Sequence, residues 1–378
     1  MGNLQYQQAG ERDCANAAID ENYQNYLIDY LLDGGSFLEN YPDLCLDPVG
    51  YNQAIAYMYQ PGDFTGERED IDYNKVPRVY GLMDSRELEA AGVTRVRLSP
   101  QLGLRGQGTL VGIIDTGVDL TSSFFRYEDG GTKIAAYWDQ EDQEGKKPAG
   151  YSFGREWDRE EIDRALEEEP RILPRDENGH GTFLAAVAAG REDEEAGFSG
   201  AAPDSELVVV KLKRPKQYLL DFYSIRDDVW ACQEDDVMLA IRYVLDTATA
   251  LQRPVSICLG IGTNLGGHGG NGSLERYISQ ISLLPGISVH IASGNEGISG
   301  HHFRRNVPQD QEFETVEFNV ADGENGFIME LWGDAPVNFS VGLISPGGEN
   351  VERIQLKRNE FRNIRFFPEN TVLQIRSF

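Results

Sequence analysis

Apolar runs and helical stripes alternate through the middle of the chain. Short apolar runs predict strands at residues 110–114, 207–210, 255–259 and 288–292. An Ala-rich segment that opens near His180 and a segment from Asp236 with one apolar stripe predict helices between them. Near-continuous apolar strands that alternate with helices are typical of a parallel sheet covered on both faces. The middle of the chain is therefore predicted to be an α/β domain.

The two flanking stretches follow other patterns. Before about residue 95, an amphipathic segment and short apolar runs predict a small α+β module; its apolar positions are Tyr23, Tyr26, Leu27, Tyr30, Leu31 and Leu32. After about residue 308, apolar and polar residues alternate in short runs at 313–320, 327–332, 338–344, 354–356 and 371–378. Such runs favour an antiparallel sandwich or jelly roll. We therefore divide the chain into residues 1–95, 96–308 and 309–378.

The last of these runs reaches the final residue. Natural carboxyl termini usually fray into polar residues, whereas Thr371 to Phe378 is an apolar strand without a successor. We therefore expect the sequence to be part of a longer chain.

Charge narrows the range of partners. The 378 residues are 40% hydrophobic and carry a formal net charge of −28. Binding to nucleic acid is disfavoured, because neutralising phosphates requires clustered Lys and Arg. The acidity favours a basic protein partner, or it only keeps the surface solvated.

Cysteine usage and the amino-terminal residues add two exclusions. Cys14, Cys45, Cys232 and Cys258 are widely spaced, so they indicate neither a zinc knuckle nor a dense disulfide framework, and we expect reduced thiols. The first residues lack a basic region followed by an apolar one, and no run of about 20 apolar residues occurs. The sequence therefore predicts neither a signal peptide nor a membrane span.

The first candidate for chemistry is Asp115, which directly follows a predicted strand and precedes the turn Thr116-Gly117. Reactive groups in open α/β sheets gather beyond the carboxyl ends of strands. The triplet Asp-Thr-Gly also occurs in aspartic peptidases, which need two copies, and this chain has one. Gly106-Gln107-Gly108 precedes the strand, so it does not match a dinucleotide-binding loop.

His180 and Asn295 are the second and third candidates. His180 stands between two glycines at the start of the Ala-rich segment, where an imidazole tied to Asp115 can act as a general base. Asn295 follows a predicted strand in a glycine-bracketed turn, and its amide can stabilise an oxyanion. Asn beside Gly is also ordinary turn chemistry.

Taken in order, these motifs resemble those of the subtilisin-like serine peptidases, the subtilases. The matching motifs are Asp115-Thr116-Gly117-Val118-Asp119, His180-Gly181-Thr182 and Ser293-Gly294-Asn295-Glu296. The resemblance implies that Cys258, Leu259 and Gly260 form an edge strand that, with Ile261 and Gly262, pairs with an extended substrate backbone. It also implies that Asp115 orients His180 and that Asn295 binds the oxyanion.

Within that family the chain is most similar to the clostridial spore-germination subtilases, through Leu102 to Gly108, Val210 to Lys213 and His301 to Phe303. The likeness implies an amino-terminal prodomain that is removed by self-cleavage before about residue 95, and a jelly-roll insertion after Asn295. It further implies a protein precursor, such as a cortex-lytic zymogen, as substrate. With no predicted signal peptide, a cytoplasmic or spore-associated location is expected.

Two departures from the family pattern affect function. The nucleophile motif G-T-S-x-A occurs nowhere in the sequence, and Ser273 is a poor substitute because it lies on the substrate-loop side of Asn295. Where several subtilases place a calcium-binding Asp, this chain has Phe124, and we predict no cofactor; His301-His302 is expected to be a solvated loop. The chain is therefore either an incomplete part of a peptidase or a pseudopeptidase that binds a peptide or regulates a partner.

Overall fold

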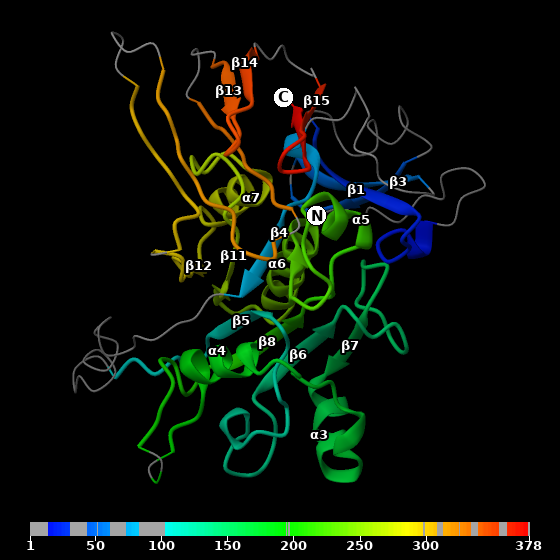
Figure 1. Ribbon diagram of the computed structural model, residues 1–378. Helices are drawn as coiled ribbons and strands as arrows, with labels where there is room; N and C mark the ends of the chain where they lie inside the picture. Colours follow the sequence, from blue (N-terminus) through cyan, green and yellow to red (C-terminus); the bar gives the residue numbers. More distant parts are fainter. Residues whose placement is uncertain are drawn as a thin grey trace.

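A six-stranded sheet organises the described part of the protein (Figure 1). The computed structural model describes residues 14–30, 44–50, 52–60, 73–82, 103–193, 195, 197–297, 299–307, 313–324, 326–333, 339–354 and 361–376. The strand order is β12-β10-β5-β8-β6-β7. The strands are β5 (Leu110–Asp115), β6 (Ile134–Asp139), β7 (Arg155–Asp158), β8 (Glu206–Lys211), β10 (Val255–Leu259) and β12 (Ile287–Ile291).

Neighbouring strands of this sheet run parallel from β12 to β6, and β7 pairs antiparallel with β6 at the edge. The strands predicted at 110–114, 207–210, 255–259 and 288–292 are confirmed as β5, β8, β10 and β12, the last shifted by one residue. β6 and β7 were not predicted. The sheet is therefore mixed, with a parallel centre.

Helices cover both faces of the sheet (Figure 1). The helices are α3 (Arg159–Glu168), α4 (His180–Ala189), α5 (Gln217–Phe222), α6 (Glu234–Ala250) and α7 (Ser273–Ile281). Successive residues of a strand point to opposite faces. Accordingly, Ile114 packs in one core cluster with Ile241 of α6, and Ile113 packs in the other with Ala185 of α4. The predicted α/β domain with helices on both faces is confirmed.

The amino-terminal module is an antiparallel sheet in the order β1-β3-β2, formed by β1 (Tyr23–Asp29), β2 (Cys45–Pro48) and β3 (Gln53–Tyr59). Short 3-10 turns lie at Cys14–Asn16 and Tyr73–Lys75. The amphipathic segment that begins at Tyr23 is thus a strand. Its polar residues Gln24 and Asn25 are buried. Asn25 donates hydrogen bonds to Tyr218 and Asp235 of the α/β domain, and Gln24 accepts one from Tyr26. Leu31 and Leu32 lie outside the described residues.

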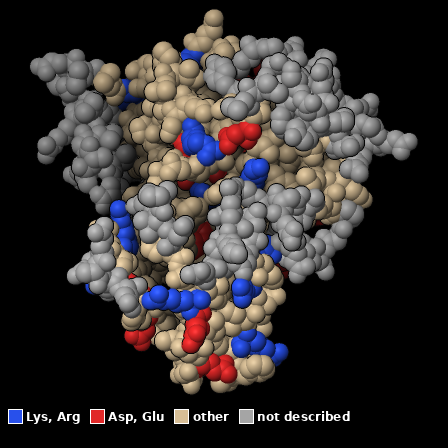
Figure 2. Space-filling model, turned by 90° about the horizontal axis from the view of Figure 1, so that it is seen from above, with Lys and Arg blue, Asp and Glu red and all other residues tan. Residues whose placement is uncertain are grey.

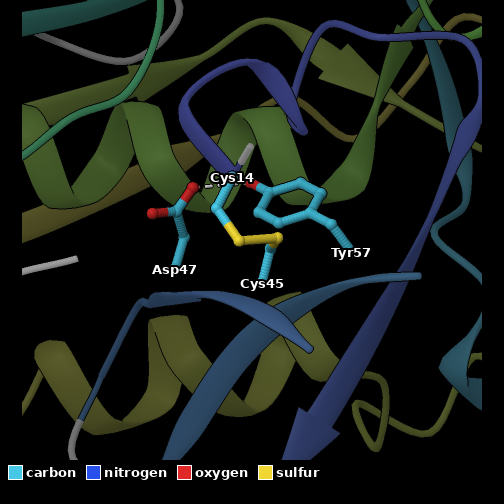
Figure 3. Close-up of a disulfide and its surroundings, with 4 residues drawn as sticks. All are labelled: Cys14, Cys45, Asp47 and Tyr57. Atoms are coloured by element: carbon cyan, nitrogen blue, oxygen red, sulfur yellow. Dashed lines mark hydrogen bonds between the residues drawn. A yellow bond between two sulfur atoms is a disulfide. The ribbon is translucent and has the colours of Figure 1, made fainter. Parts of the chain in front are cut away.

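A disulfide between Cys14 and Cys45 ties the first 3-10 turn to β2, beside the hydrogen bond from Tyr57 to Asp47 (Figure 3). The expectation that all thiols are reduced is therefore wrong for this pair. The two cysteines are 31 residues apart in sequence, and the fold brings their Cα atoms to 5.4 Å. Cys232 and Cys258 are free thiols.

A third sheet, in the order β11-β4-β9, joins the amino-terminal module to the α/β domain. β4 (Val79–Leu82) pairs antiparallel with β9 (Cys232–Gln233) on one side and β11 (Ile261–Gly262) on the other. The predicted boundary at residues 95 and 96 lies outside the described residues, as does residue 308 at the second boundary.

The carboxyl-terminal region contains two antiparallel hairpins, β13 (Val341–Ile344) with β14 (Asn350–Ile354) and β15 (Phe361–Phe366) with β16 (Thr371–Arg376). The strands predicted at 313–320 and 327–332 are wrong: both segments are extended but belong to no ladder among the described residues. Residues 355, 356, 377 and 378 of the other predicted strands lie outside the described residues. A complete jelly roll stays a prediction.

Charges on the described surface are interleaved. On the face shown in Figure 2, Lys and Arg side chains lie beside Asp and Glu side chains. Examples among the ion pairs are Arg276 with Asp29 and Arg105 with Asp204. None of the helices in the described ranges has the length and apolar character that crossing a bilayer requires.

Candidate active site

Asp115 and His180 form a hydrogen-bonded pair at the carboxyl end of β5. Oδ1 of Asp115 lies 2.8 Å from Nδ1 of His180 and accepts a further bond of 2.8 Å from the Thr116 backbone N–H. Asp115 is fully buried, and the His180 side chain is 15% exposed. A carboxylate acceptor requires the proton of a neutral imidazole to be on Nδ1, so Nε2 is the basic nitrogen. The pair suits general-base chemistry.

Glycines explain how α4 delivers His180 to this position. The helix begins at His180 after Gly179, whose φ of 85° lies in the left-handed region that favours glycine. A side chain at Gly181 would place its Cβ 2.1 Å from the Gly117 carbonyl oxygen and 3.1 Å from Oδ1 of Asp115. The G-H-G sequence therefore permits a close approach of the helix to the Asp115 turn.

Asp176 is a residue of the site that sequence reasoning missed. Its carboxylate accepts hydrogen bonds from the Thr116 hydroxyl at 2.7 Å, the Gly179 backbone N–H at 2.9 Å and the Thr182 backbone N–H at 2.9 Å. The bonds to Gly179 and Thr182 satisfy amide groups at the start of α4. Asp176 stands four residues before His180 and the N-cap of α4 is Gly179, so a capping pattern in the sequence does not single it out.

The predicted substrate strand approaches the catalytic pair at Gly260. A Cβ at this position would lie 3.1 Å from Cε1 of His180 and 3.3 Å from Oδ2 of Asp115. The predicted edge position of Cys258 and Leu259 is wrong: β10 pairs with β5 on one side and β12 on the other, so both residues are in an interior strand. Strand β10 ends at Leu259, so Gly260 lies just beyond the sheet.

Ile261 and Gly262 already pair with another segment of the same chain. In this antiparallel ladder Ile261 faces Leu82 and Gly262 faces Gly81 of β4. Strand β4 of the same chain therefore pairs with one edge of β11, the strand that was predicted to pair with a substrate backbone.

Cys258 is not an activated nucleophile. Burial, with a smaller contribution from the Asp115 carboxylate, raises the pKa of the Cys258 thiol to about 11. A thiol needs a lowered pKa to react as thiolate near neutral pH. The chemistry of the site therefore depends on Asp115 and His180 and not on this cysteine.

Asn295 lies exposed in the turn after β12. Its neighbour Glu296 accepts hydrogen bonds from the Asn264 side chain at 2.8 Å and from Nδ1 of His301 at 2.5 Å. These contacts tie the Asn295 turn to the loop that follows β11. His302 stacks on His268 of that loop, with ring centroids 4.7 Å apart.

The remaining candidates have structural surroundings. Ser273 is buried at the start of α7, and its carbonyl accepts a bond from Gln53 of the amino-terminal module. Phe124 packs edge to face on Phe198. No cluster of three or more His, Cys, Asp or Glu residues suited to a metal ion occurs among the described residues. The absence of a cofactor stays a prediction.

Comparison with known proteins agrees with this arrangement. The subtilase family model matches residues 106–319. Subtilisin from Bacillus sp. (strain TA39) is 30% identical over 122 residues, which are 32% of this chain and 25% of that protein. The structure of the CspB protease of Clostridium perfringens superposes with a TM-score of 0.61 at 27% identity, covering 73% of this chain and 54% of that one.

The chain thus spans about a quarter of the length of the subtilisin and about half of the CspB chain. The family match covers more than half of the present sequence and includes Asp115, His180 and Asn295. This chain belongs to the subtilase family.

Proposed function

We propose that the chain is an incomplete part of a subtilisin-like serine endopeptidase that cleaves a protein precursor. The observation that supports this most directly is the buried 2.8 Å bond from His180 to Asp115, with the backbone of Gly260 against both. The proposed substrate backbone lies along Gly260 to Gly262. The nucleophile serine comes from residues outside this sequence, because no G-T-S-x-A motif occurs in it.

In the proposed mechanism, Nε2 of His180 takes the proton of the serine hydroxyl as that oxygen attacks the scissile carbonyl carbon. Asp115 holds the imidazole in the required tautomer and stabilises its cation. The Asn295 amide donates a hydrogen bond to the oxyanion that develops on the carbonyl oxygen. His180 then passes the proton to the leaving amine, and the same residues act in reverse order when water releases the acyl group.

The amino-terminal module is proposed to be this peptidase's own prodomain. Support comes from β4, which adds to β11 as an antiparallel strand. Such β-augmentation is how an extended peptide binds a free strand, through main-chain hydrogen bonds. Cleavage of the connection between β4 and β5, before about residue 95, would separate the module from the α/β domain.

We propose that residue 124 is not a calcium ligand, because Phe124 is apolar and packs on Phe198.

A serine-directed fluorophosphonate tests the proposal. These 378 residues should not be labelled, whereas a product extended through a G-T-S segment should be labelled at that serine. In the extended product, His180→Ala should slow labelling and peptide cleavage by about 10⁴-fold or more. Asn295→Ala should lower kcat by about 10²–10³-fold. Labelling of the 378 residues at any serine would contradict the assignment.

The second candidate is a pseudopeptidase that binds a peptide without cleaving it. The pairing of β4 with β11 is compatible with this function, because a peptide can bind by strand addition without a catalytic serine. An extended product that binds a peptide, competes with β4 and leaves the peptide intact would establish this function instead.

A further inference from the structure

We propose that Asp176 is a positioning residue for the catalytic pair: it holds the Asp115 turn and the first turn of α4 in one arrangement. This inference rests on the proposed peptidase function. The carboxylate of Asp176 uses both oxygens. Oδ1 accepts from the Thr116 hydroxyl and the Gly179 N–H, and Oδ2 accepts from the N–H of Thr182 at 2.9 Å and its hydroxyl at 2.6 Å. Four donors fill the acceptor capacity of a carboxylate.

Thr116 connects Asp176 to the reacting pair. Its hydroxyl donates to Asp176 and accepts a 2.9 Å bond from the backbone N–H of Gly181, the residue after His180. Its own backbone N–H donates to Oδ1 of Asp115. Thr116 is 4% exposed, so water does not readily replace these bonds.

A second bridge runs through Thr182. Its hydroxyl donates to Asp176 and accepts a 2.9 Å bond from the backbone N–H of Asp119. The turn after β5 is therefore fastened to α4 at two points, and Asp176 accepts a hydrogen bond at both. A helix cap accounts only for the bonds to Gly179 and Thr182. The bond to Thr116 reaches a turn 60 residues earlier in the chain.

The consequence concerns the distance between Asp115 and His180. Gly181 leaves no room for the helix to move closer, since a Cβ there would already overlap the Gly117 carbonyl. The hydrogen bonds of Asp176 with Thr116 and Thr182 oppose movement of α4 away from the Asp115 turn. Other charged groups near the pair are Asp176 and the ion pair of Lys211 with Glu141 beside Gly117, and Asp139 and Glu177 act electrostatically on Lys211.

The test is an NMR titration of the His180 imidazole in the 378-residue chain, assigned by the signal that a His180→Gln variant loses. Thr116→Val removes the connecting hydroxyl without changing any charge. We expect it to lower the measured pKa of His180 by about one unit, because the imidazolium loses a well-placed Asp115. The far-downfield signal of the Nδ1 proton should weaken in parallel.

Asp176→Asn keeps the size of the side chain and is expected to fold, as checked by circular dichroism. It should lower the pKa of His180 by at least a similar amount. The double variant should lower it by less than the sum of the two single shifts, because the bond to Thr116 is one of the two connections that Asp176 makes. Glu177→Gln is the matched control: it neutralises the exposed carboxylate next to Asp176 and should leave His180 unchanged.

Two results would overturn the inference. One is a Thr116→Val variant with the wild-type pKa and Nδ1 signal, and the other is fully additive shifts in the double variant. Neither measurement needs the serine. If the extended product cleaves nothing, the proposed function fails while the titration still decides the role of Asp176. In an active product, Thr116→Val should lower kcat by about tenfold with KM unchanged.

Discussion

Strand β5 and the segment 313–333 are both rich in large apolar residues, but these residues have opposite surroundings. Ile113 and Ile114 are 0% exposed, whereas Phe318 is 50% and Leu331 is 64% exposed. β5 has a paired strand on each side and a helix over each face. The segment 313–333 belongs to no ladder among the described residues. An apolar pattern thus selects a buried position only where other elements cover both faces.

Burial also declines within the sheet from its centre to its edge. Leu259 of β10 is 2% exposed, whereas Ile291 of the neighbouring edge strand β12 is 56% exposed. Asp115 lies at the fully buried centre, and Asn295 follows the exposed edge strand. The Asp115–His180 pair therefore lies on a buried strand and Asn295 follows an exposed one. Matched substitutions in buried and exposed regions measure how much this difference in burial contributes to stability.

The largest contrast is expected from removing one isoleucine from β5 and one from strand β13, which follows the segment 313–333 and is also exposed. Ile113→Ala should lower the free energy of unfolding by about 2–5 kcal/mol, because it deletes a fully buried side chain and leaves a cavity. Ile344→Ala, at a side chain that is 72% exposed in β13, should change it by less than about 0.5 kcal/mol. Urea unfolding followed by tryptophan fluorescence measures both.

An equal cost for the two variants would break the comparison. It would mean that the apolar side chains of the carboxyl-terminal region are covered in solution.

A second contrast comes from adding a methyl group to a glycine in β5 and to one in β13. A Cβ at Gly112 of β5 would lie 2.7 Å from Cγ1 of Val244 on α6, so Gly112→Ala should cost about 1–3 kcal/mol. At Gly342 of β13 the nearest atom is the Val351 carbonyl oxygen at 3.5 Å. Gly342→Ala should therefore be neutral or stabilise by up to about 1 kcal/mol, through the unfolded chain. Thermal unfolding of the pair decides, and a stabilising Gly112→Ala would show that α6 is loosely packed on β5.

The parts of the structure that could be predicted from the sequence are those with local patterns of apolar residues or local motifs. The interior strand β6 was overlooked although its residues 134–138 are also apolar. Strands β5, β8, β10 and β12 were predictable because their apolar runs are continuous, and Asp115 and His180 because their motifs are local. β7 was not, because its sequence Arg155-Glu156-Trp157-Asp158 is mostly polar; the Arg155 guanidinium covers the Trp157 ring at 3.7 Å. A mostly polar segment gains its burial from such contacts, which no periodicity reveals.

Three further features were missed for one reason, namely that each depends on contacts between residues far apart in sequence. The Cys14–Cys45 disulfide requires β2 to lie beside the first 3-10 turn. The role of Asp176 requires its bond to Thr116. The burial of the polar residue Asn25 in β1 depends on Tyr218 and Asp235, which lie about 200 residues later. Spacing within one segment contains none of this information.

The smallest expected effect is a dependence of stability on pH that arises in the sheet domain. Lys133 is 1% exposed, and its ammonium donates to the carbonyls of Ala189 and Pro203 at 2.6 and 2.7 Å. Burial lowers the pKa of Lys133 to about 8 from its ordinary 10.5. Between these values the unfolded chain binds more protons than the folded one, so stability should rise with pH across this window and be lower below pH 8.

Lys133→Met removes the titrating group, so the rise in stability between about pH 8.5 and pH 9.5 should be smaller than in the wild type by roughly 1 kcal/mol. Lys146→Met is the control, because Lys146 lies in the loop between β6 and β7 with its side chain 63% exposed. Its slope should match that of the wild type over these pH values. Urea midpoints measured at four pH values give both slopes. If Lys133→Met keeps the wild-type slope, the buried ammonium is solvated well enough by its two carbonyls to titrate normally, and the contrast between buried and exposed regions would then concern apolar packing alone.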